Sequence, residues 1–376
     1  MRVHPGSFMA QARIPSLYGL RALSITFVLV QHTVRSTGNP FVKYTTHFGT
    51  LGVMIFFVIS GFIITNLLLR EAERGPISLL QFYLRRGLRL LPALFAYLVF
   101  VAIIQEFVVD LKVRPIYFFS GAFFLVPYIP WGHHPWATGH LWSLAVEEHF
   151  YMLWPPLLAW LGVKRAKWLL IVAVVIMPVL RVCWYKADQD PLLNSLVGIG
   201  DLMAFGALAA IWSHRQPEQM LRYMRRSVTL GRIVAVVAIG IILYLRTTRI
   251  LPIVDVPFGI TVIGLSVAYL LLSVCFAEQT SLLFRLLNWP AVAWVGTISY
   301  SLYLWQQPFL YGYSPQNQWW QQFPVNIVFA VVAGIASHYL VERPFLKLKS
   351  RLKPYNNAQT LSLPLPVGSS DVRIPH

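Results

Sequence analysis

The sequence has 376 residues, of which 57% are hydrophobic and only 12% are charged, and its formal net charge is +17. This low charged fraction excludes an ordinary soluble globule, in which about 25% of residues are charged. A nucleic-acid binder is also disfavoured, because the Lys and Arg residues lie between apolar runs instead of forming one basic face. The composition predicts an all-α, polytopic transmembrane helical bundle.

About ten apolar runs approach the ~20 residues that a helix needs to cross a bilayer. A further apolar stretch at 116–130 is short and interrupted by proline, so we expect a re-entrant or interfacial segment there. A short amphipathic surface helix is expected within 70–89. In chain order, the predicted membrane helices are 17–36, 50–69, 90–109, 141–163, 167–185, 192–212, 232–247, 256–276, 290–311 and 324–341.

The charges of the connecting segments predict the orientation. Basic segments follow the second, fourth and sixth predicted helices, whereas residues 312–323 carry no charge. The positive-inside rule then places both termini in the cytoplasm, in a multi-pass inner or plasma membrane protein. We expect a cytoplasmic N-terminus at 1–16, a membrane domain at 17–345 and a basic, then disordered, cytoplasmic tail at 346–376.

The first predicted helix contains Arg21 and, eleven residues later, His32. Helical geometry places the two side chains within about 20° of one face and roughly 16 Å apart. Alone, Arg21 is explained as a positive-inside anchor and His32 as an interhelical hydrogen-bond partner. An ionisable group inside the membrane is nevertheless a functional candidate, and an imidazole suits general-base catalysis.

The stretch at 139–155 carries the adjacent acids Glu147 and Glu148. Only one of them can face a given cavity, and Ser143 shares a helix face with Glu147. We place Glu147 at a depth similar to that of His32, and we expect it to orient that ring as a catalytic partner. The alternative is that the acids only neutralise nearby Arg or His charges.

Further polar side chains lie on other predicted helices. Arg86 and Arg89 stand at the cytoplasmic start of a helix, where either one alone is explained as a topology anchor. Together with Arg21 they would form a phosphate clamp. Tyr300 and Tyr303 lie one helical ridge apart, although placement in an aromatic belt explains them equally well. Gln306 is a costly amide near the outer side, and Ser60 precedes Gly61 in a small pair that permits close helix approach.

The histidines at 133, 134 and 140 do not predict a metal site. His133, His134 and His140 lack a zinc-binding spacing and have no clear acidic fourth ligand. The sequence also contains no nucleophile elbow and no phosphate-binding glycine loop. We therefore expect no metal.

Six stretches occur in the order typical of one family and cover nearly the whole chain: "LYGLRALSITFVLVQH", "GVMIFFVISGFIIT", "FYLRRGLRLLP", "HLWSLAVEEHFYMLWP", "ISYSLYLWQQP" and "LVERPF". The chain thereby resembles the integral-membrane acyltransferase family 3. The family's Arg–ten residues–His signature falls on Arg21 and His32, its paired arginines on Arg86 and Arg89, and its helix acid on Glu147. Gln306 stands where many members have a histidine.

This resemblance implies an acyl-CoA-dependent O-acyltransferase with acetyl-CoA as the expected donor. The acceptor would be a hydroxyl of a carbohydrate, a glycan or a small molecule, and membrane lipids would surround the protein. The alternatives are a transporter or flippase for a lipid-linked or sugar substrate, for which we detect no internal repeat, and a non-catalytic membrane scaffold. Release of free CoA on addition of acceptor distinguishes the acyltransferase from the transporter.

Overall fold

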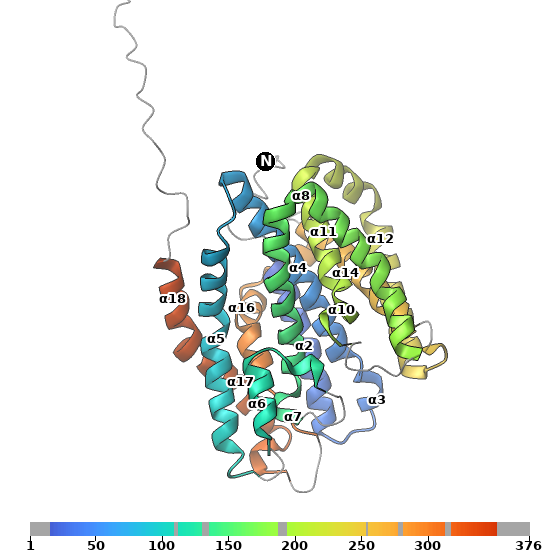
Figure 1. Ribbon diagram of the computed structural model, residues 1–376. Helices are drawn as coiled ribbons and strands as arrows, with labels where there is room; N and C mark the ends of the chain where they lie inside the picture. The colour runs from blue at the N-terminus through green and yellow to red at the C-terminus, as the bar shows by residue number, and fades with distance from the viewer. Residues whose placement is uncertain are drawn as a thin grey trace, which may run out of the picture.

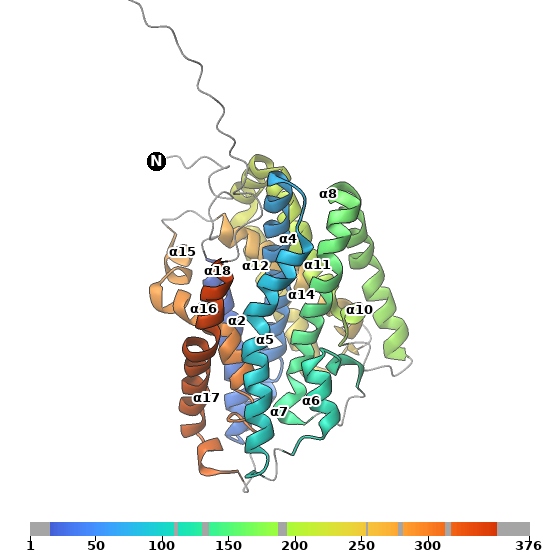
Figure 2. The ribbon, with the colours of Figure 1, turned by 60° about the vertical axis from the view of Figure 1, so that its left-hand side comes forward.

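The computed structural model describes residues 16–108, 112–129, 135–186, 194–252, 255–276, 281–312 and 317–351. Within these ranges the ordered elements are all helices and no strand occurs, which confirms the predicted all-α class. Figures 1 and 2 show a bundle whose long helices run roughly along one common axis. Seven helical stretches of the described chain are long and apolar enough to cross a membrane.

Three long helices begin the described part of the chain. α2 (Leu17–Ser36) has the predicted bounds, and a short α3 (Val42–Thr45) connects it to α4 (Phe48–Arg74). α5 (Leu79–Ile104) begins eleven residues before its predicted start. The separate surface helix expected within 70–89 is therefore wrong, because α4 and α5 extend into that segment from both sides.

The predicted short segment at 116–130 contains only small elements. α6 (Pro115–Ala122) has eight residues, and a 3-10 turn η2 (Val126–Tyr128) follows it. Eight helical residues cover only about 12 Å, which is far less than the ~30 Å of a bilayer core. A single-turn helix, α7 (Trp136–Gly139), then leads into α8.

α8 (Leu141–Lys186) contains both predicted helices at 141–163 and 167–185 as two legs of one bent element. The bend lies at Gly162, whose φ of 68° and ψ of 163° are not helical. A side chain would be strained in that backbone conformation, so glycine is required there. Figure 1 shows the two legs meeting at the end of the bundle that also holds the α4–α5 junction.

Of the remaining helices, α11 packs closely against α4, since an added Cβ at Gly61 would lie 2.1 Å from the carbonyl oxygen of Met203. α11 and α16 have 15 and 16 residues, fewer than the ~20 that usually cross a bilayer. That these two helices cross the membrane, and that the chain has about ten membrane helices, therefore stays a prediction. In order, the elements are α10 (Leu196–Ile199), α11 (Asp201–Arg215), α12 (Pro217–Thr248), π-helix η3 (Asp255–Gly259), α14 (Ile260–Cys275), α15 (Leu282–Leu287), α16 (Pro290–Trp305), η4 (Trp319–Gln321), α17 (Val325–Ala336), π-helix η5 (Ser337–Glu342) and α18 (Arg343–Arg351).

A buried ion pair fastens α8 to α11. Arg181 and Asp201 are both 0% exposed, and the guanidinium Nη1 and Nη2 donate to the two carboxylate oxygens at 2.9 and 2.8 Å. Arg181 also donates to the backbone oxygens of Pro257 and Gly198. Because every strong acceptor around this guanidinium is a protein group, we assign the cluster to the scaffold.

Candidate active site

A cavity of about 180 Å³ lies among α2, α4, α5, α8 and α16. These helices are far apart in the sequence, and each contributes polar side chains to an otherwise apolar wall. The structure brings together eight of the eleven predicted site residues in this lining: Arg21, Ser60, Arg86, Arg89, Ser143, Glu147, Tyr300 and Tyr303. Glu148, His32 and Gln306 are not among the lining residues.

Arg86 neutralises both acids of α8 on one side of the cavity. Its Nη2 lies 2.7 Å from an oxygen of Glu148 and 3.2 Å from an oxygen of Glu147. Its Nε donates to Glu148 at 2.9 Å, and its guanidinium carbon lies 3.9 Å from the ring centroid of Tyr151. Of the two acids only Glu147 lines the cavity, but one arginine contacts both.

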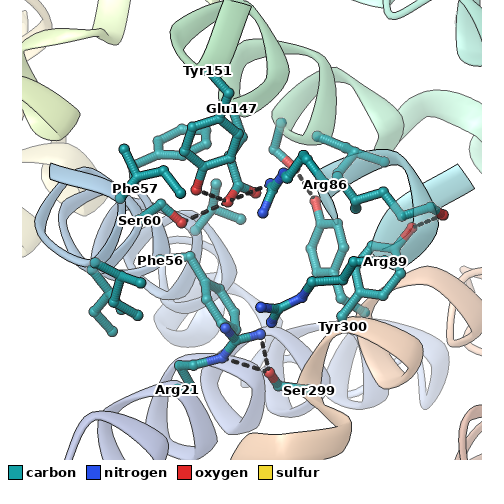
Figure 3. A pocket seen from close by; sticks show the side chains of 18 of the residues that line it. Arg21, Phe56, Phe57, Ser60, Arg86, Arg89, Glu147, Tyr151, Ser299 and Tyr300 are labelled. Carbon is teal, nitrogen blue, oxygen red and sulfur yellow. Dashed lines mark hydrogen bonds and ion pairs between the residues drawn. The ribbon is translucent and has the colours of Figure 1, made fainter. Parts of the chain in front are cut away.

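Glu147 is held by hydroxyl groups as well as by Arg86 (Figure 3). Ser60 of α4 and Tyr151 of α8 each donate to its Oε1 at 2.6 Å. This arrangement gives Ser60 a direct polar role, while the adjacent Gly61 allows the close approach of α11. The carboxylate is thus fixed between α4, α5 and α8.

Arg21 and Arg89 face each other across the cavity from α2 and α5 (Figure 3). Arg21 donates from Nε and Nη2 to the hydroxyl of Ser299, at 3.2 and 3.1 Å. No acidic side chain of the described residues forms an ion pair with either arginine. Two converging guanidinium groups without a carboxylate between them form a site suited to an anion such as phosphate.

Tyr303 and Ser143 line the cavity and, with the backbone of His140, form a hydrogen-bonded cluster that we call the partition. The hydroxyls of Tyr303 and Ser143 lie 2.5 Å apart, and the tyrosine also donates to the backbone oxygen of His140 at 3.0 Å. Tyr300 donates to the backbone oxygen of Leu90 at 3.0 Å. The two tyrosines therefore have specific hydrogen bonds inside the bundle, and an aromatic belt does not account for them.

His32 lies outside the cavity lining, with Gln306 as its partner. Its Nδ1 is 2.7 Å from the Gln306 Oε1, and the Gln306 Nε2 donates to the Gln307 Oε1 at 2.7 Å. Since an amide oxygen can only accept, Nδ1 carries the proton and Nε2 keeps its lone pair. The edge of the ring meets the indole of Trp136, with centroids 5.1 Å apart.

The expectation that Glu147 orients His32 is therefore wrong. The carboxylate binds Ser60, Tyr151 and Arg86, and the amide of Gln306 holds the imidazole instead. The two side chains also have different surroundings: Glu147 lines the cavity with Arg21 and Arg86, whereas His32 contacts Gln306 and Trp136 of α7.

Sequence reasoning missed four side chains of this region. Ser299 and Tyr151 fix Arg21 and Glu147, and His140, whose backbone belongs to the partition, has its Nε2 3.2 Å from the Leu304 carbonyl oxygen. Trp136 contacts His32 from α7. Tyr151 lies four residues after Glu147, which was an available signal, whereas nothing local pointed to Ser299 or Trp136.

A metal centre finds no support in the described part of the chain. There, no group of three His, Cys, Asp or Glu side chains could hold an ion. His140 is buried among aromatic rings, with the Tyr97 centroid 5.5 Å away. His133 and His134 lie outside the described residues.

The fold and the site together define a helical membrane protein with a polar cavity whose lining includes Arg21 and Arg89, two arginines outside every ion pair of the described residues. The chain matches the family described as "Acyltransferase domain" over residues 14–343. It belongs to this family, acyltransferase family 3, which confirms the resemblance noted from the motifs.

Several relatives are named as O-acetyltransferases. The peptidoglycan O-acetyltransferase OatA of Listeria monocytogenes is 28% identical over 363 residues, which cover 90% of this chain and 56% of the relative. The putative peptidoglycan O-acetyltransferase YrhL of Bacillus subtilis is 28% identical over 368 residues, or 88% and 54%. The chain thus spans about half the length of these curated relatives. No solved structure is significantly similar to it.

Proposed function

We propose that this protein is a membrane O-acyltransferase that moves an acetyl group from cytoplasmic acetyl-CoA to a hydroxyl of a carbohydrate on the outer side. In this proposal the chain crosses the inner or plasma membrane ten times, residues 17–345 form the catalytic domain and both termini are cytoplasmic. The basic α4–α5 and α11–α12 junctions and the bend of α8 lie at one end of the bundle (Figure 1), in agreement with the positive-inside rule.

The observation that carries the proposal is the pair of converging arginines, Arg21 and Arg89, at the basic end of the cavity. They would bind the phosphates of CoA, while Arg86 serves mainly to hold Glu147 and Glu148 in place. The cavity volume of about 180 Å³ is below the ~300–1,000 Å³ of sites that enclose a drug-sized ligand. It therefore suits the thin pantetheine arm, with the nucleotide remaining at the cytoplasmic opening.

His32 is the proposed general base. It lies about 16 Å along α2 from Arg21, and its Nε2 has a free lone pair when Gln306 accepts from Nδ1. Nε2 would take the proton of the acceptor hydroxyl as the oxygen attacks the thioester carbonyl carbon. The C–S bond then breaks, and the proton held by the imidazole passes to the departing CoA thiolate.

The partition sets a requirement on this mechanism. In the structure Tyr303, which lines the cavity, bonds both Ser143 and His140, whereas His32 is not in the lining. The thioester therefore reaches His32 only when the tyrosine side chain swings aside. Such a step would keep water away from the thioester until donor and acceptor are both bound.

The acceptor class follows from the relatives and from the surroundings of His32. Two of the relatives are named as peptidoglycan O-acetyltransferases, one of them putatively. Amides and aromatic rings surround the imidazole, namely Gln306, Gln307 and Trp136, and such groups suit the hydroxyls and the apolar faces of sugar rings. A small-molecule hydroxyl acceptor is the other possible outcome of the test below.

The test uses the purified protein in inside-out proteoliposomes with a glycan acceptor in the lumen. Acetyl-CoA is added outside, and free CoA is measured with a thiol reagent in the outer solution. The proposal predicts CoA release that depends on the acceptor, together with acetylated glycan in the lumen. Movement of glycan across the membrane without thioester consumption would instead identify a transporter, and acetylation from another donor only would refute acetyl-CoA.

A further inference from the structure

A charged side chain, Arg35, lies one turn beyond His32 on α2 and has no role in the mechanism above. Arg35 extends from the last turn of α2, and its guanidinium carbon lies 4.6 Å from the ring centroid of Trp136. The same indole meets His32 at 5.1 Å. We propose that Arg35, stacked on Trp136 beside His32, binds an anionic group of the acceptor, so that the protein selects carboxylate- or phosphate-bearing carbohydrates.

The platform under Arg35 is built by three parts of the chain. The Trp136 Nε1 donates to the backbone oxygen of Gln307 at 2.7 Å, which fixes the indole plane against the end of α16. A Cβ added at Gly312 would lie 3.6 Å from the Arg35 Nε, so the arginine stem passes over that backbone. α2, α7 and the segment after α16 therefore fix the position of this guanidinium. A surface arginine that extends freely into solvent would not need these contacts.

Arg35 has open hydrogen-bonding capacity toward the outside. The residue is exposed, and none of the ion pairs among the described residues includes it. Stacking leaves the edge of a guanidinium, with its fork of donors, available for a carboxylate or a phosphate. The two segments nearest to Trp136 and Gly312 in sequence, 131–134 and 313–316, contain no acidic residue that could serve instead.

The spacing between Arg35 and His32 suits a single acceptor unit. Because both groups contact one indole ring, they cannot be farther apart than the sum of 4.6 and 5.1 Å. That span matches a sugar residue that carries an acidic substituent and a reacting hydroxyl. Binding of the anion at Arg35 would position the hydroxyl at the Nε2 of His32, so Arg35 determines specificity through the acceptor KM.

This inference rests on the proposed function, but its first test does not use the reaction. Binding of a trigalacturonate, its methyl ester and a phosphorylated neutral trisaccharide is measured by thermal shift of the purified full chain without donor. We expect the acid and the phosphate to bind about 10- to 100-fold more tightly than the ester, the range for a charge-assisted contact. Arg35→Gln should abolish that difference, and Arg35→Lys should restore part of it.

The matched control is Lys43→Gln, which removes another exposed outer cation that stacks on Tyr44 and should leave the preference intact. In the CoA-release assay, Arg35→Gln should raise the KM for the acidic acceptor and leave the donor KM unchanged. Equal binding of acid and ester to the wild type would overturn the inference and assign Arg35 to the lipid interface as an anchor. Acid-selective binding without any CoA release would retain the site and refute the proposed function.

Discussion

Replacement of Arg86 by alanine should destabilise the protein because one guanidinium compensates two carboxylates. The Arg86 side chain is 14% exposed, and those of Glu147 and Glu148 are 22% and 9% exposed. The Arg86 Nη2 lies 3.2 Å from an oxygen of Glu147 and 2.7 Å from an oxygen of Glu148. Removal of one partner from a buried ion pair costs about 3–5 kcal/mol. We expect the lower end of this range, since Ser60 and Tyr151 still donate to Glu147 in the variant.

The assay is thermal unfolding of the purified protein in detergent, with Arg89→Ala as the matched variant. Arg89 lines the same cavity from the same helix, but no ion pair of the described residues includes it. Its loss should leave the unfolding temperature almost unchanged and raise the KM for acetyl-CoA. The double change Arg86→Gln with Glu148→Gln should recover part of the lost stability. Equal effects of Arg86→Ala and Arg89→Ala on unfolding would refute this division of roles.

Three further substitutions test separate parts of the structure. Asp201→Asn should lower the free energy of unfolding by about 3–5 kcal/mol, because its partner Arg181 is 0% exposed; an unchanged unfolding temperature would contradict this. Gly61→Leu should cost about 1–3 kcal/mol through overpacking against α11, unlike Gly240→Leu, where nothing lies within 4 Å of an added Cβ. Gln306→Leu should lower kcat by about tenfold or more, since it removes a hydrogen bond worth about 1–3 kcal/mol, whereas Gln306→His, which can still accept from His32, should retain most activity.

Much of the fold could be predicted because membrane helices are encoded locally. An apolar run of sufficient length defines a crossing segment whatever it packs against, and α2 shows this with bounds that match the prediction. The helix ends were less predictable where polar residues continue the helix. Arg86 and Arg89 lie inside α5 although they interrupt its apolar pattern, because Arg86 finds its acidic partners on another helix.

The sequence could predict that most candidate site residues lie close together, but not which side chains contact each other. Arg21, Glu147 and Tyr303 converge on one cavity, as their shared departure from an apolar membrane composition suggested. Which acid meets which base depends on how the helices pack against each other, and the sequence of one helix does not encode this. Glu147 bonds Ser60 on α4, and the amide of Gln306 takes the place beside His32.

The most direct test of the account is the effect of His32→Ala on kcat for acceptor-dependent CoA release at saturating acetyl-CoA and glycan. Loss of a general base typically lowers the rate ~10²–10⁴-fold, and we predict a fall of this size with little change in the donor KM. His149→Ala, which removes a half-buried histidine outside the cavity lining, should keep kcat near that of the wild type. Near wild-type turnover by a folded His32→Ala protein would contradict the proposed mechanism.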